Sequence, residues 1–258
     1  MDKEKLKNTI ESLLDTFLEA GKIAKEISKK GVKITIKSDK SPVTDGDILV
    51  DKILRKKIKD LTPSIPIISE ETVNLNIQNK HKDFWLIDPI DGTKDYIKKK
   101  DEYTLNAALI INLKPAAAIV YAPAKDRLFF SYGKNLAYET FRGETFQLNC
   151  SKKNLGKIIG LENSNHTPTE ILNIYKKYNV SQTVKMSSSI KFCVIAAGEA
   201  DIYAAKARAY EWDIAAGHAI LVHAGGSITT HDEKEFLYGK KNYKNLPIIA
   251  KRSNNLEK

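Results

Sequence analysis

The spacing of apolar side chains predicts two amphipathic helices near the start of the chain. Over the first thirty residues, apolar positions recur with the period of a helix that buries one face; they are Leu6, Ile10, Leu13, Leu14, Phe17, Leu18, Ala24 and Ile27. This helix is predicted to end before Gly31. A second stripe follows Asp47 and comprises Ile48, Ile53, Leu54, Ile58 and Leu61. Between them, residues 32–36 alternate apolar and polar side chains, which predicts a strand with one face in solvent, followed by a polar loop over residues 38–47.

Short apolar runs predict a set of strands in the next hundred residues. Residues 65–68 and 84–87 are mostly apolar, and each run leads into acidic residues. Further apolar stretches, separated by short polar turns, lie at residues 104–112, 115–121, 127–132, 136–140 and 145–148. Consecutive strands with short connections tend to pair with one another, so this region predicts an antiparallel sheet.

From about residue 152 the pattern changes to alternating strands and helices. Strands are predicted at residues 157–161, 183–186, 201–204, 227–229 and 246–251, and helices at residues 168–178, 188–197 and 213–223. This alternation is typical of an α/β arrangement. We therefore predict one compact α/β unit with two lobes, an N-terminal α+β lobe over residues 1–151 and a C-terminal α/β lobe over residues 152–258.

Composition and charge narrow the class of protein. A hydrophobic content of 42% and a charged content of 29% are typical of a soluble globular protein, and no apolar run reaches the length of a membrane span. The net charge of +10 comes mainly from scattered lysines, since only five of the 42 basic residues are arginines. No basic face interleaved with aromatic residues is present, so a nucleic-acid partner is not expected. The chain has only two cysteines, Cys150 and Cys193, and they are far apart in the sequence. This fits a protein in the reducing cytoplasm better than one with a disulfide framework or a zinc site.

The stretch from Trp85 to Tyr96 contains the clearest candidate for chemistry. A predicted strand runs into Asp88 and Asp91, and two carboxylates three residues apart across a proline turn can point at one spot, which then attracts a divalent cation. Gly92 lets a ligand approach the backbone, and a helix that begins at Thr93 would offer free N–H groups to a phosphate. An Asp-rich turn with a purely structural role is the alternative.

Other acidic residues stand where either a site or a helix cap would place them. Glu70 and Glu71 follow the short strand that ends at residue 68, although adjacent acids at a strand end are often plain surface. Asp47 can cap the second helix, and Asp213 can cap the helix predicted at residues 213–223. Capping and metal binding are compatible, so the residues alone leave both interpretations open.

Four motifs in order give the chain a family resemblance. They read Ser41-Pro-Val-Thr-Asp-Gly-Asp47, Ile68-Ser-Glu-Glu71, Asp88-Pro-Ile-Asp-Gly-Thr93 and Trp212-Asp-Ile-Ala-Ala-Gly217. The last two resemble the signatures of the inositol monophosphatase superfamily of Mg²⁺-dependent, lithium-sensitive phosphatases. Residues 37–47, 61–71, 84–124 and 187–226 specifically resemble the 3'(2'),5'-bisphosphate nucleotidases of the CysQ type, and the similarity is weaker over residues 129–183.

The resemblance implies a layered αβαβα sandwich with the site between the lobes, and two or three Mg²⁺ ions in that site. The implied metal ligands are the main-chain carbonyl of Ile90 and the carboxylates of Glu70, Asp88, Asp91 and Asp213. By the same resemblance, Asp47 and Thr93 hold the nucleophilic water, and the backbone amides of Gly92 and Thr93 bind the phosphate. We expect direct attack by water without a phosphoenzyme, and inhibition by Li⁺.

The resemblance also implies a substrate. It points to hydrolysis of the 3'-phosphate of 3'-phosphoadenosine 5'-phosphate to AMP and phosphate, a reaction of sulfur metabolism. Ser188, Lys191 and His166 match residues that contact the nucleotide, and Asp213 is expected to contact the substrate as well as the metal. Inositol monophosphatase or fructose-1,6-bisphosphatase activity is the alternative within the superfamily. A non-catalytic nucleotide- or RNA-binding protein is the alternative outside it.

The expected partner is this small phosphorylated nucleotide, and the expected location is the cytoplasm. The sequence does not distinguish a monomer from a homodimer. It also does not decide whether the N-terminal helix associates peripherally with the inner face of the membrane. One departure bears on the preferred substrate: the subfamily has an arginine where this chain has Ala204-Ala205, so Lys206 or Arg208 would replace it. Lysine lacks the bidentate fork of arginine. Residues 161–166 also differ from the usual Ser-Arg-Ser-His.

Overall fold

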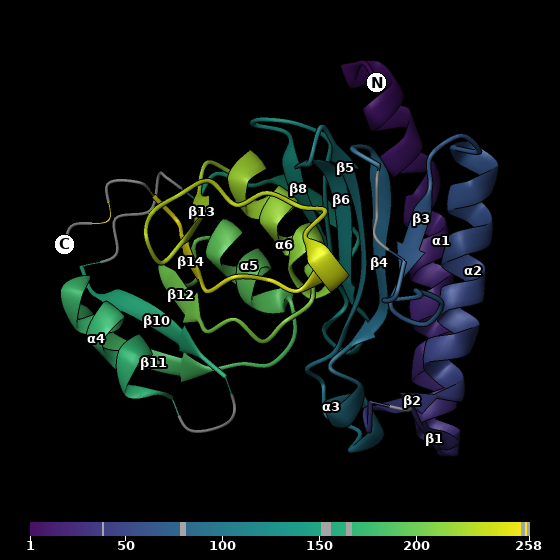
Figure 1. The fold of residues 1–258 in the computed structure, drawn as a ribbon, viewed down its shortest axis with the longest axis horizontal. Coiled ribbons are helices and arrows are strands. Elements are labelled where there is room, and N and C mark those ends of the chain that lie inside the picture. The colour runs from purple at the N-terminus through teal and green to yellow at the C-terminus, as the bar shows by residue number, and fades with distance from the viewer. Residues whose placement is uncertain (38, 78–80, 151–155, 164–166, 254–255, 257–258) are drawn as a thin grey trace.

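Helices and sheets alternate in stacked layers. The structure is a computed structural model, which describes residues 1–258 except 38, 78–80, 151–155, 164–166, 254, 255, 257 and 258. Figure 1 shows the layers edge-on, and from one side to the other they are α1 (Lys3–Lys30) with α2 (Asp45–Leu61), a seven-stranded sheet, α5 (Ile190–Ala196) with α6 (Glu211–His223), a five-stranded sheet, and α4 (Thr169–Lys177). The predicted αβαβα sandwich is confirmed.

The seven-stranded sheet has the order β3-β4-β5-β6-β7-β8-β9. Only β3 and β4 are parallel, and the other neighbours are antiparallel, as predicted. Strand β4 is buried on both faces because helices cover both sides of the sheet, which explains its unbroken apolar sequence. The strands are β3 (Ile67–Ser69), β4 (Phe84–Asp91), β5 (Thr104–Ile111), β6 (Lys114–Ala122), β7 (Arg127–Ser131), β8 (Ala137–Phe141) and β9 (Glu144–Gln147), with the 3-10 helix η1 (Pro123–Lys125) between β6 and β7.

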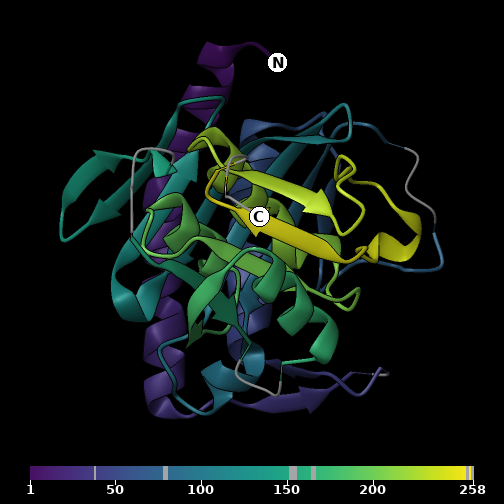
Figure 2. The ribbon, with the colours of Figure 1, turned by 90° about the vertical axis from the view of Figure 1, so that its left-hand side faces the viewer.

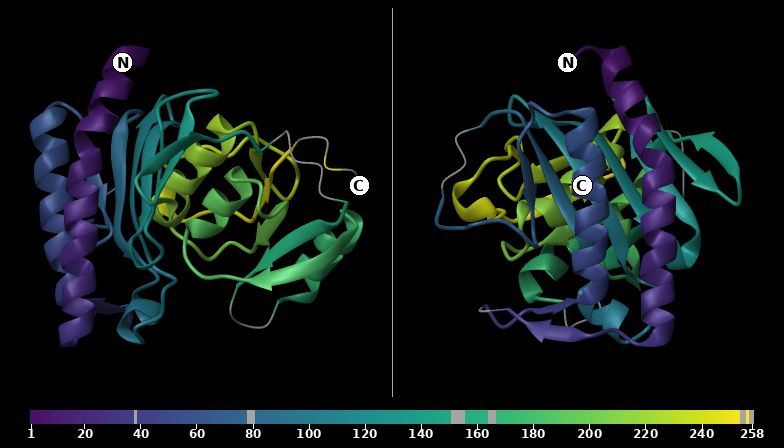
Figure 3. Two further views of the ribbon diagram at one scale, coloured as in Figure 1. Left: turned by 180° about the vertical axis from the view of Figure 1, so that it is seen from behind. Right: turned by 90° about the vertical axis from the view of Figure 1, so that its right-hand side faces the viewer.

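Helices α1 and α2 lie side by side over one face of this sheet, as the right-hand panel of Figure 3 shows. The Asp2 carboxylate caps α1 by accepting the N–H of Lys5 at 2.8 Å, and Thr44 caps α2. Most of the apolar positions of both helices pack in one cluster with β4 side chains such as Trp85 and Ile87, whereas Leu18 and Ile48 are exposed. Despite the length of α1, none of the helices in the described ranges is apolar enough to cross a membrane.

The five-stranded sheet has the order β11-β10-β12-β14-β13 and faces the viewer in Figure 2. β10 is parallel to both β11 and β12, whereas β14 is antiparallel to its neighbours β12 and β13. Helix α6 lies between the two sheets and is apolar on nearly all sides, which is the composition of a fully buried helix. The strands are β10 (Ile158–Glu162), β11 (Val180–Lys185), β12 (Ile202–Ala205), β13 (Ser227–Thr230) and β14 (Ile248–Lys251).

The hairpin of β1 (Ile34–Ile36) and β2 (Pro42–Thr44) corrects one prediction. A strand is present, but the predicted buried face is wrong, because Ile34 and Ile36 are 50% and 63% exposed. Among the described strands, β1 pairs only with β2, and Figure 2 shows the hairpin projecting at the bottom of the molecule. None of the described layers therefore covers the apolar side of β1. The predicted polar loop also contains β2.

Several element boundaries differ from the predictions by a few residues. Helix α5 begins at Ile190 rather than at residue 188, and α6 begins at Glu211 rather than at residue 213. Strand β11 spans Val180–Lys185, which extends the predicted strand at its start. The predicted lobe boundary at residues 151 and 152 lies outside the described residues.

Candidate active site and metal centre

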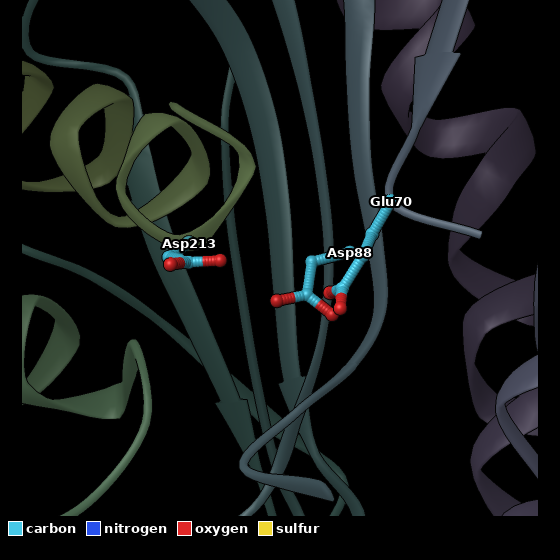
Figure 4. Close-up of side chains that lie close together, drawn as sticks. All are labelled: Glu70, Asp88 and Asp213. Atoms are coloured by element: carbon cyan, nitrogen blue, oxygen red, sulfur yellow. The ribbon is translucent and has the colours of Figure 1, made fainter. Parts of the chain in front are cut away.

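Three carboxylates from separate elements converge at the carboxyl-terminal part of β4. Glu70 follows β3, Asp88 lies within β4, and Asp213 lies in the first turn of α6. Figure 4 shows their side chains directed toward one space between the seven-stranded sheet and α6. One carboxylate oxygen of each lies within 4.8 Å of those of the other two, a spacing that could hold a metal ion. The structure thus brings together three of the predicted ligands.

Asp88 is the buried member of this acid cluster. Within the described part of the chain its Oδ1 atom has no hydrogen-bond partner, although buried carboxylate oxygens are normally paired. Burial raises the pKa of Asp88 well above its ordinary value, and the charges of Glu70, Asp91 and Asp213 raise it further. Burial and then the charge of Asp91 also raise the pKa of Asp213. Without a cation the cluster repels itself, and its oxygen-only donors fit a hard divalent cation.

Asp91 ends β4 and connects the acid cluster to the loop before α5. Its Oδ2 atom accepts a hydrogen bond from the N–H of Ser189 at 2.5 Å. Burial raises the pKa of Asp91 to about 6, although the Lys191 ammonium and the Ser189 N–H oppose this shift. The carbonyl oxygen of Ile90, a predicted ligand, lies 3.1 Å from the Thr93 hydroxyl, whose single proton can be donated either to this oxygen or to Asp47.

The turn after β4 requires glycine. Gly92 has a φ of +95°, and a Cβ at this position would lie 2.9 Å from the carbonyl oxygen of Glu102. Helix α3 (Thr93–Ile97) begins directly afterwards, so a helix does start at Thr93, which is the condition for free N–H groups at this position. The backbone of residues 92 and 93 is therefore turned tightly beside the acid cluster.

Asp47 is both part of a helix cap and a neighbour of the site. Its Oδ2 atom accepts hydrogen bonds from the N–H and the hydroxyl of Thr44, at 2.8 and 2.5 Å. Its Oδ1 atom accepts a 3.3 Å hydrogen bond from the Thr93 hydroxyl. Burial raises the pKa of Asp47. Thr44 is the N-cap residue, so Asp47 supports the cap from the first turn and reaches Thr93 at the same time.

Lys37 reaches the acid cluster although the sequence analysis does not predict it as a site residue. Its Nζ atom lies 3.1 Å from the Glu70 carboxylate and 2.8 Å from that of Glu71. Burial lowers the pKa of Lys37, but the charges of Glu70 and Glu71 outweigh this and raise it overall. Burial raises the pKa of Glu71 to about 7 despite the contact with Lys37. The start of the first stretch of family resemblance at Lys37 is the sequence signal that points to it.

A pocket of about 380 Å³ opens beside Asp213. Ser188 and Lys191, the predicted nucleotide contacts, line it together with Tyr203. Lys191 is buried, and its Nζ donates to the carbonyl of Ser188 at 2.6 Å and lies 5.1 Å from the centre of the Tyr203 ring. Burial lowers the pKa of Lys191 to about 8. An anion in this pocket would meet a poorly hydrated ammonium group.

Lys206 and Arg208 follow β12, close to where the resemblance expects an arginine. Both line the main pocket and a smaller adjoining cavity of about 110 Å³. The Lys206 ammonium is paired with Glu170 at 3.1 Å. After burial, the charge of Arg208 is a further cause that lowers the pKa of Lys191, which shows that the two cations are near each other. His166, the remaining predicted contact, lies outside the described residues.

Comparison with known proteins assigns the family. A sequence profile of the Inositol monophosphatase family matches residues 5–256. The chain belongs to this family. The 3'(2'),5'-bisphosphate nucleotidase CysQ of Buchnera aphidicola is 36% identical over 204 residues, which cover 79% of this chain and 76% of that protein. The protein of the same name from Salmonella typhimurium is 35% identical over 205 residues, which cover 79% and 81%.

Solved structures of inositol monophosphatase family members share the fold. CysQ from Bacteroides thetaiotaomicron aligns with a TM-score of 0.76 at 28% identity, over 95% of this chain and 97% of that one. The IMPase of Thermotoga maritima aligns with a TM-score of 0.74 at 22% identity, over 92% and 89%, which bears on the fold alone. The chain is therefore a phosphatase of a metal-dependent family, with an acidic cluster that can bind a metal ion.

Proposed function

We propose that this phosphatase is a Mg²⁺-dependent 3'(2'),5'-bisphosphate nucleotidase that converts 3'-phosphoadenosine 5'-phosphate to AMP and phosphate. The proposal rests on one observation above all: the buried ammonium of Lys191 lines the same pocket as Asp91 and Asp213. A substrate with a second, unreacting phosphate can bind such a cation, whereas a monophosphate offers only the reacting group. The names of the relatives at 36% and 35% identity support the same substrate class.

The acid cluster is the proposed site of two or three Mg²⁺ ions. Carboxylate and carbonyl oxygens are the ligands that Mg²⁺ prefers. When bound, the ions supply positive charge that neutralises the phosphate and favours ionisation of the attacking water. The unpaired Oδ1 atom of Asp88 is available as a ligand atom in this arrangement. The proposed ligands are the carbonyl of Ile90 and the carboxylates of Glu70, Asp88, Asp91 and Asp213.

Thr93 and Asp47 are the proposed pair that orients the nucleophilic water. The Thr93 hydroxyl has a single proton and can donate it to Asp47, at 3.3 Å. Its lone pairs then accept a hydrogen bond from the water, which directs a water lone pair toward the phosphorus. Asp47 is held in turn by the N–H and the hydroxyl of Thr44. The water attacks directly, and no group of the protein becomes phosphorylated.

The two phosphates and the nucleoside are proposed to occupy different parts of the pocket. The backbone N–H groups of Gly92 and Thr93 bind the reacting phosphate, next to the metal ions. Lys191, assisted by Arg208, binds the second phosphate, while Ser188, which also lines this pocket, contacts the nucleotide. The nucleoside extends through the main pocket toward the smaller adjoining cavity, which is lined by Asn163, Ile171 and Tyr175 among others.

Side-by-side assays test this proposal. Phosphate release is measured from 3'-phosphoadenosine 5'-phosphate, inositol 1-phosphate and fructose 1,6-bisphosphate, each with Mg²⁺ and with excess chelator. We expect the highest kcat/KM for the bisphosphorylated nucleotide and no turnover in chelator. A preference for the inositol substrate would overturn the nucleotidase assignment and leave the metal site standing. Full activity in chelator would overturn the metal dependence.

Two further measurements test the route. In a single turnover in isotopically labelled water, the released phosphate should contain one solvent oxygen, as direct attack requires. Li⁺ should inhibit at concentrations at which Na⁺ has no effect, because it can enter a Mg²⁺ position with only one positive charge. Phosphate without the label would exclude direct attack by water.

A further inference from the structure

A loop between β13 and β14 surrounds the N-terminus of α6. Residues 236–245, called the clasp below, include the 3-10 helix η3 (Lys241–Tyr243), and Figure 1 shows η3 beside α6. Helix α6 brings Asp213 to the acid cluster. Contacts on its first turn therefore bear directly on the proposed metal site.

Glu211, the first residue of α6, makes the central contact with the clasp. Its side chain is fully buried, with 0% exposure. The carboxylate accepts hydrogen bonds from the N–H groups of Gly239 and Lys240, at 2.9 and 2.8 Å, and lies 2.9 Å from the Lys240 Nζ. These donors all belong to the clasp. Glu211 is therefore neutralised by protein groups, unlike the acid two residues further along the helix.

Another clasp residue holds the backbone that leads into α6. The N–H of Asn245 donates to the carbonyl of Ala209 at 3.0 Å, and its side-chain amide donates to the carbonyl of Tyr210. The N–H of Tyr210 donates in turn to Oδ2 of Asp213 at 2.8 Å. The clasped backbone thereby fixes one carboxylate oxygen of Asp213.

The clasp is also attached to the seven-stranded sheet. The N–H of Tyr238 donates to the carbonyl of Leu113 in the turn between β5 and β6 at 3.0 Å, and the N–H of Leu113 donates to the carbonyl of Lys82 just before β4, also at 3.0 Å. The Tyr238 hydroxyl lies 2.8 Å from Nδ1 of His218 on α6. These contacts connect β4 to α6, the two elements whose carboxylates face each other.

We propose that Glu211 is a positioning residue that holds Asp213 in place for metal binding by anchoring the clasp. The inference rests on the proposed Mg²⁺ dependence. Removal of the Glu211 charge leaves the Lys240 ammonium without its anion and weakens the two N–H contacts, so the first turn of α6 gains freedom. Metal affinity depends on how firmly the ligands are oriented, and the loss of such an outer contact typically lowers it about 10- to 100-fold.

The test compares Glu211→Gln with Asp201→Asn. Asp201 is a matched control because it is also fully buried, accepts the N–H of Ile159 at 2.7 Å and binds Arg252, but precedes β12 in the other sheet. Two Mg²⁺ midpoints are measured for each protein, one for the rise in melting temperature and one for turnover. Both variants should lose stability, whereas only Glu211→Gln should raise both midpoints, by about tenfold or more.

Lys240→Met is the second variant, since it removes the ammonium group and keeps the backbone donors. It should also raise both Mg²⁺ midpoints, but by a smaller factor than Glu211→Gln. If Glu211→Gln does not fold, Lys240→Met alone tests whether the clasp contact affects metal binding. Unchanged midpoints, or an equal rise in Asp201→Asn, would show that Glu211 acts on fold stability alone and would overturn the inference. A wild-type protein whose melting temperature ignores Mg²⁺ would instead refute the proposed metal dependence itself.

Discussion

The protein buries carboxylates in two contrasting ways. Asp201, beside the five-stranded sheet, is fully buried and has partners within the protein, the guanidinium of Arg252 and the N–H of Ile159 at 2.7 Å. Asp88, in the seven-stranded sheet, is as deeply buried but faces other carboxylates, and its Oδ1 atom has no partner among the residues that the structure describes. The two residues have the same side chain at the same depth, so the difference lies in what surrounds them.

Asp201 and Asp88 represent two kinds of buried acid. One kind is paired with protein groups, and the other can be neutralised only by a bound cation. A buried carboxylate with protein partners contributes to a defined fold, and breaking its pairing is costly. A buried carboxylate among other carboxylates opposes folding until a cation arrives. Glu211 belongs to the first kind and Asp213 to the second, although two positions separate them. Burial alone therefore does not identify a site, whereas burial next to other carboxylates distinguishes Asp88 from Asp201.

Breaking the Asp201 pair should have the largest effect. Asp201→Asn leaves Arg252 without its anion, and the loss of one partner of a buried pair typically costs about 3–5 kcal/mol. Urea unfolding measures this loss. Glu235→Gln is the control, because its pair with Lys114 is exposed on both sides and should cost less than about 1 kcal/mol. Similar losses in both variants would contradict the structural role of Asp201.

Asp88→Asn should leave the fold intact and remove activity. The neutral side chain relieves repulsion in the acid cluster, so in chelator the melting temperature should equal or exceed that of the wild type. Turnover should fall by about a hundred- to a thousandfold or more, the usual cost of removing a group that stabilises the transition state. Asp91→Asn should behave alike. A drop in melting temperature as large as that of Asp201→Asn would show that the cluster is not repulsive.

Lys191→Ala extends the comparison to a buried cation. Loss of a charge-assisted contact costs about 1.5–3 kcal/mol, so kcat/KM for 3'-phosphoadenosine 5'-phosphate should fall about ten- to a hundredfold. The loss for inositol 1-phosphate should be far smaller. Lys206→Ala serves as the control, since Lys206 is half exposed and paired with Glu170, and should change kcat/KM by less than about threefold. An equal loss for both substrates would make Lys191 a structural residue.

Two buried histidines on α6 give the smallest effect. Burial lowers the pKa of His218 to about 3 and that of His223 to about 4. In the unfolded chain both should titrate near their ordinary pKa of about 6.5. Between about pH 6.5 and pH 4 the unfolded state therefore binds more protons than the folded state, so stability falls as the pH falls through this window.

His223→Gln tests this pH dependence. Glutamine can keep a hydrogen bond to the Ser131 hydroxyl, which now lies 3.0 Å from Nδ1 of His223. The free energy of unfolding is measured in urea at pH 7.5 and at pH 5 for both proteins. The variant should lose about 2 kcal/mol less than the wild type between the two pH values. Equal losses would mean that His223 is not held neutral in the folded protein.

Apolar periodicity predicts much of the fold because most elements bury the stripe or run that their sequence displays. Helix α1 and strand β4 illustrate this, since α1 packs against Trp85 and Ile87 on one face of the strand, while Phe84 and Leu86 are buried on the other face. The same reasoning fails for β1, where Ile34 and Ile36 alternate as in a half-buried strand but remain exposed. A local pattern records which side chains are apolar, and it does not record whether another layer covers them.

Some contacts of the candidate site could likewise be predicted from the sequence, and others could not. Asp88 and Asp91 are three residues apart in sequence, and both lie in β4, whose register with β5 shifts between them rather than forming the predicted proline turn. Their meeting with Glu70 and Asp213 could be predicted only through the family resemblance, because these residues come from distant parts of the chain. The role of Lys37 depends on carboxylates that reach it only in the folded state. Local patterns of apolar and polar residues do not predict contacts of this kind.

The assembly of the acid cluster from β3, β4 and α6 has a consequence for how long a folded molecule survives. Asp213 joins Glu70 and Asp88 only when α6 docks on the seven-stranded sheet, so the complete set of like charges exists only in the docked structure. A cation that binds only the completed cluster stabilises the native state more than the transition state, and such interactions slow unfolding while hardly changing the folding rate. The lifetime of the enzyme against proteolysis should then depend on the concentration of the ion that it uses for catalysis.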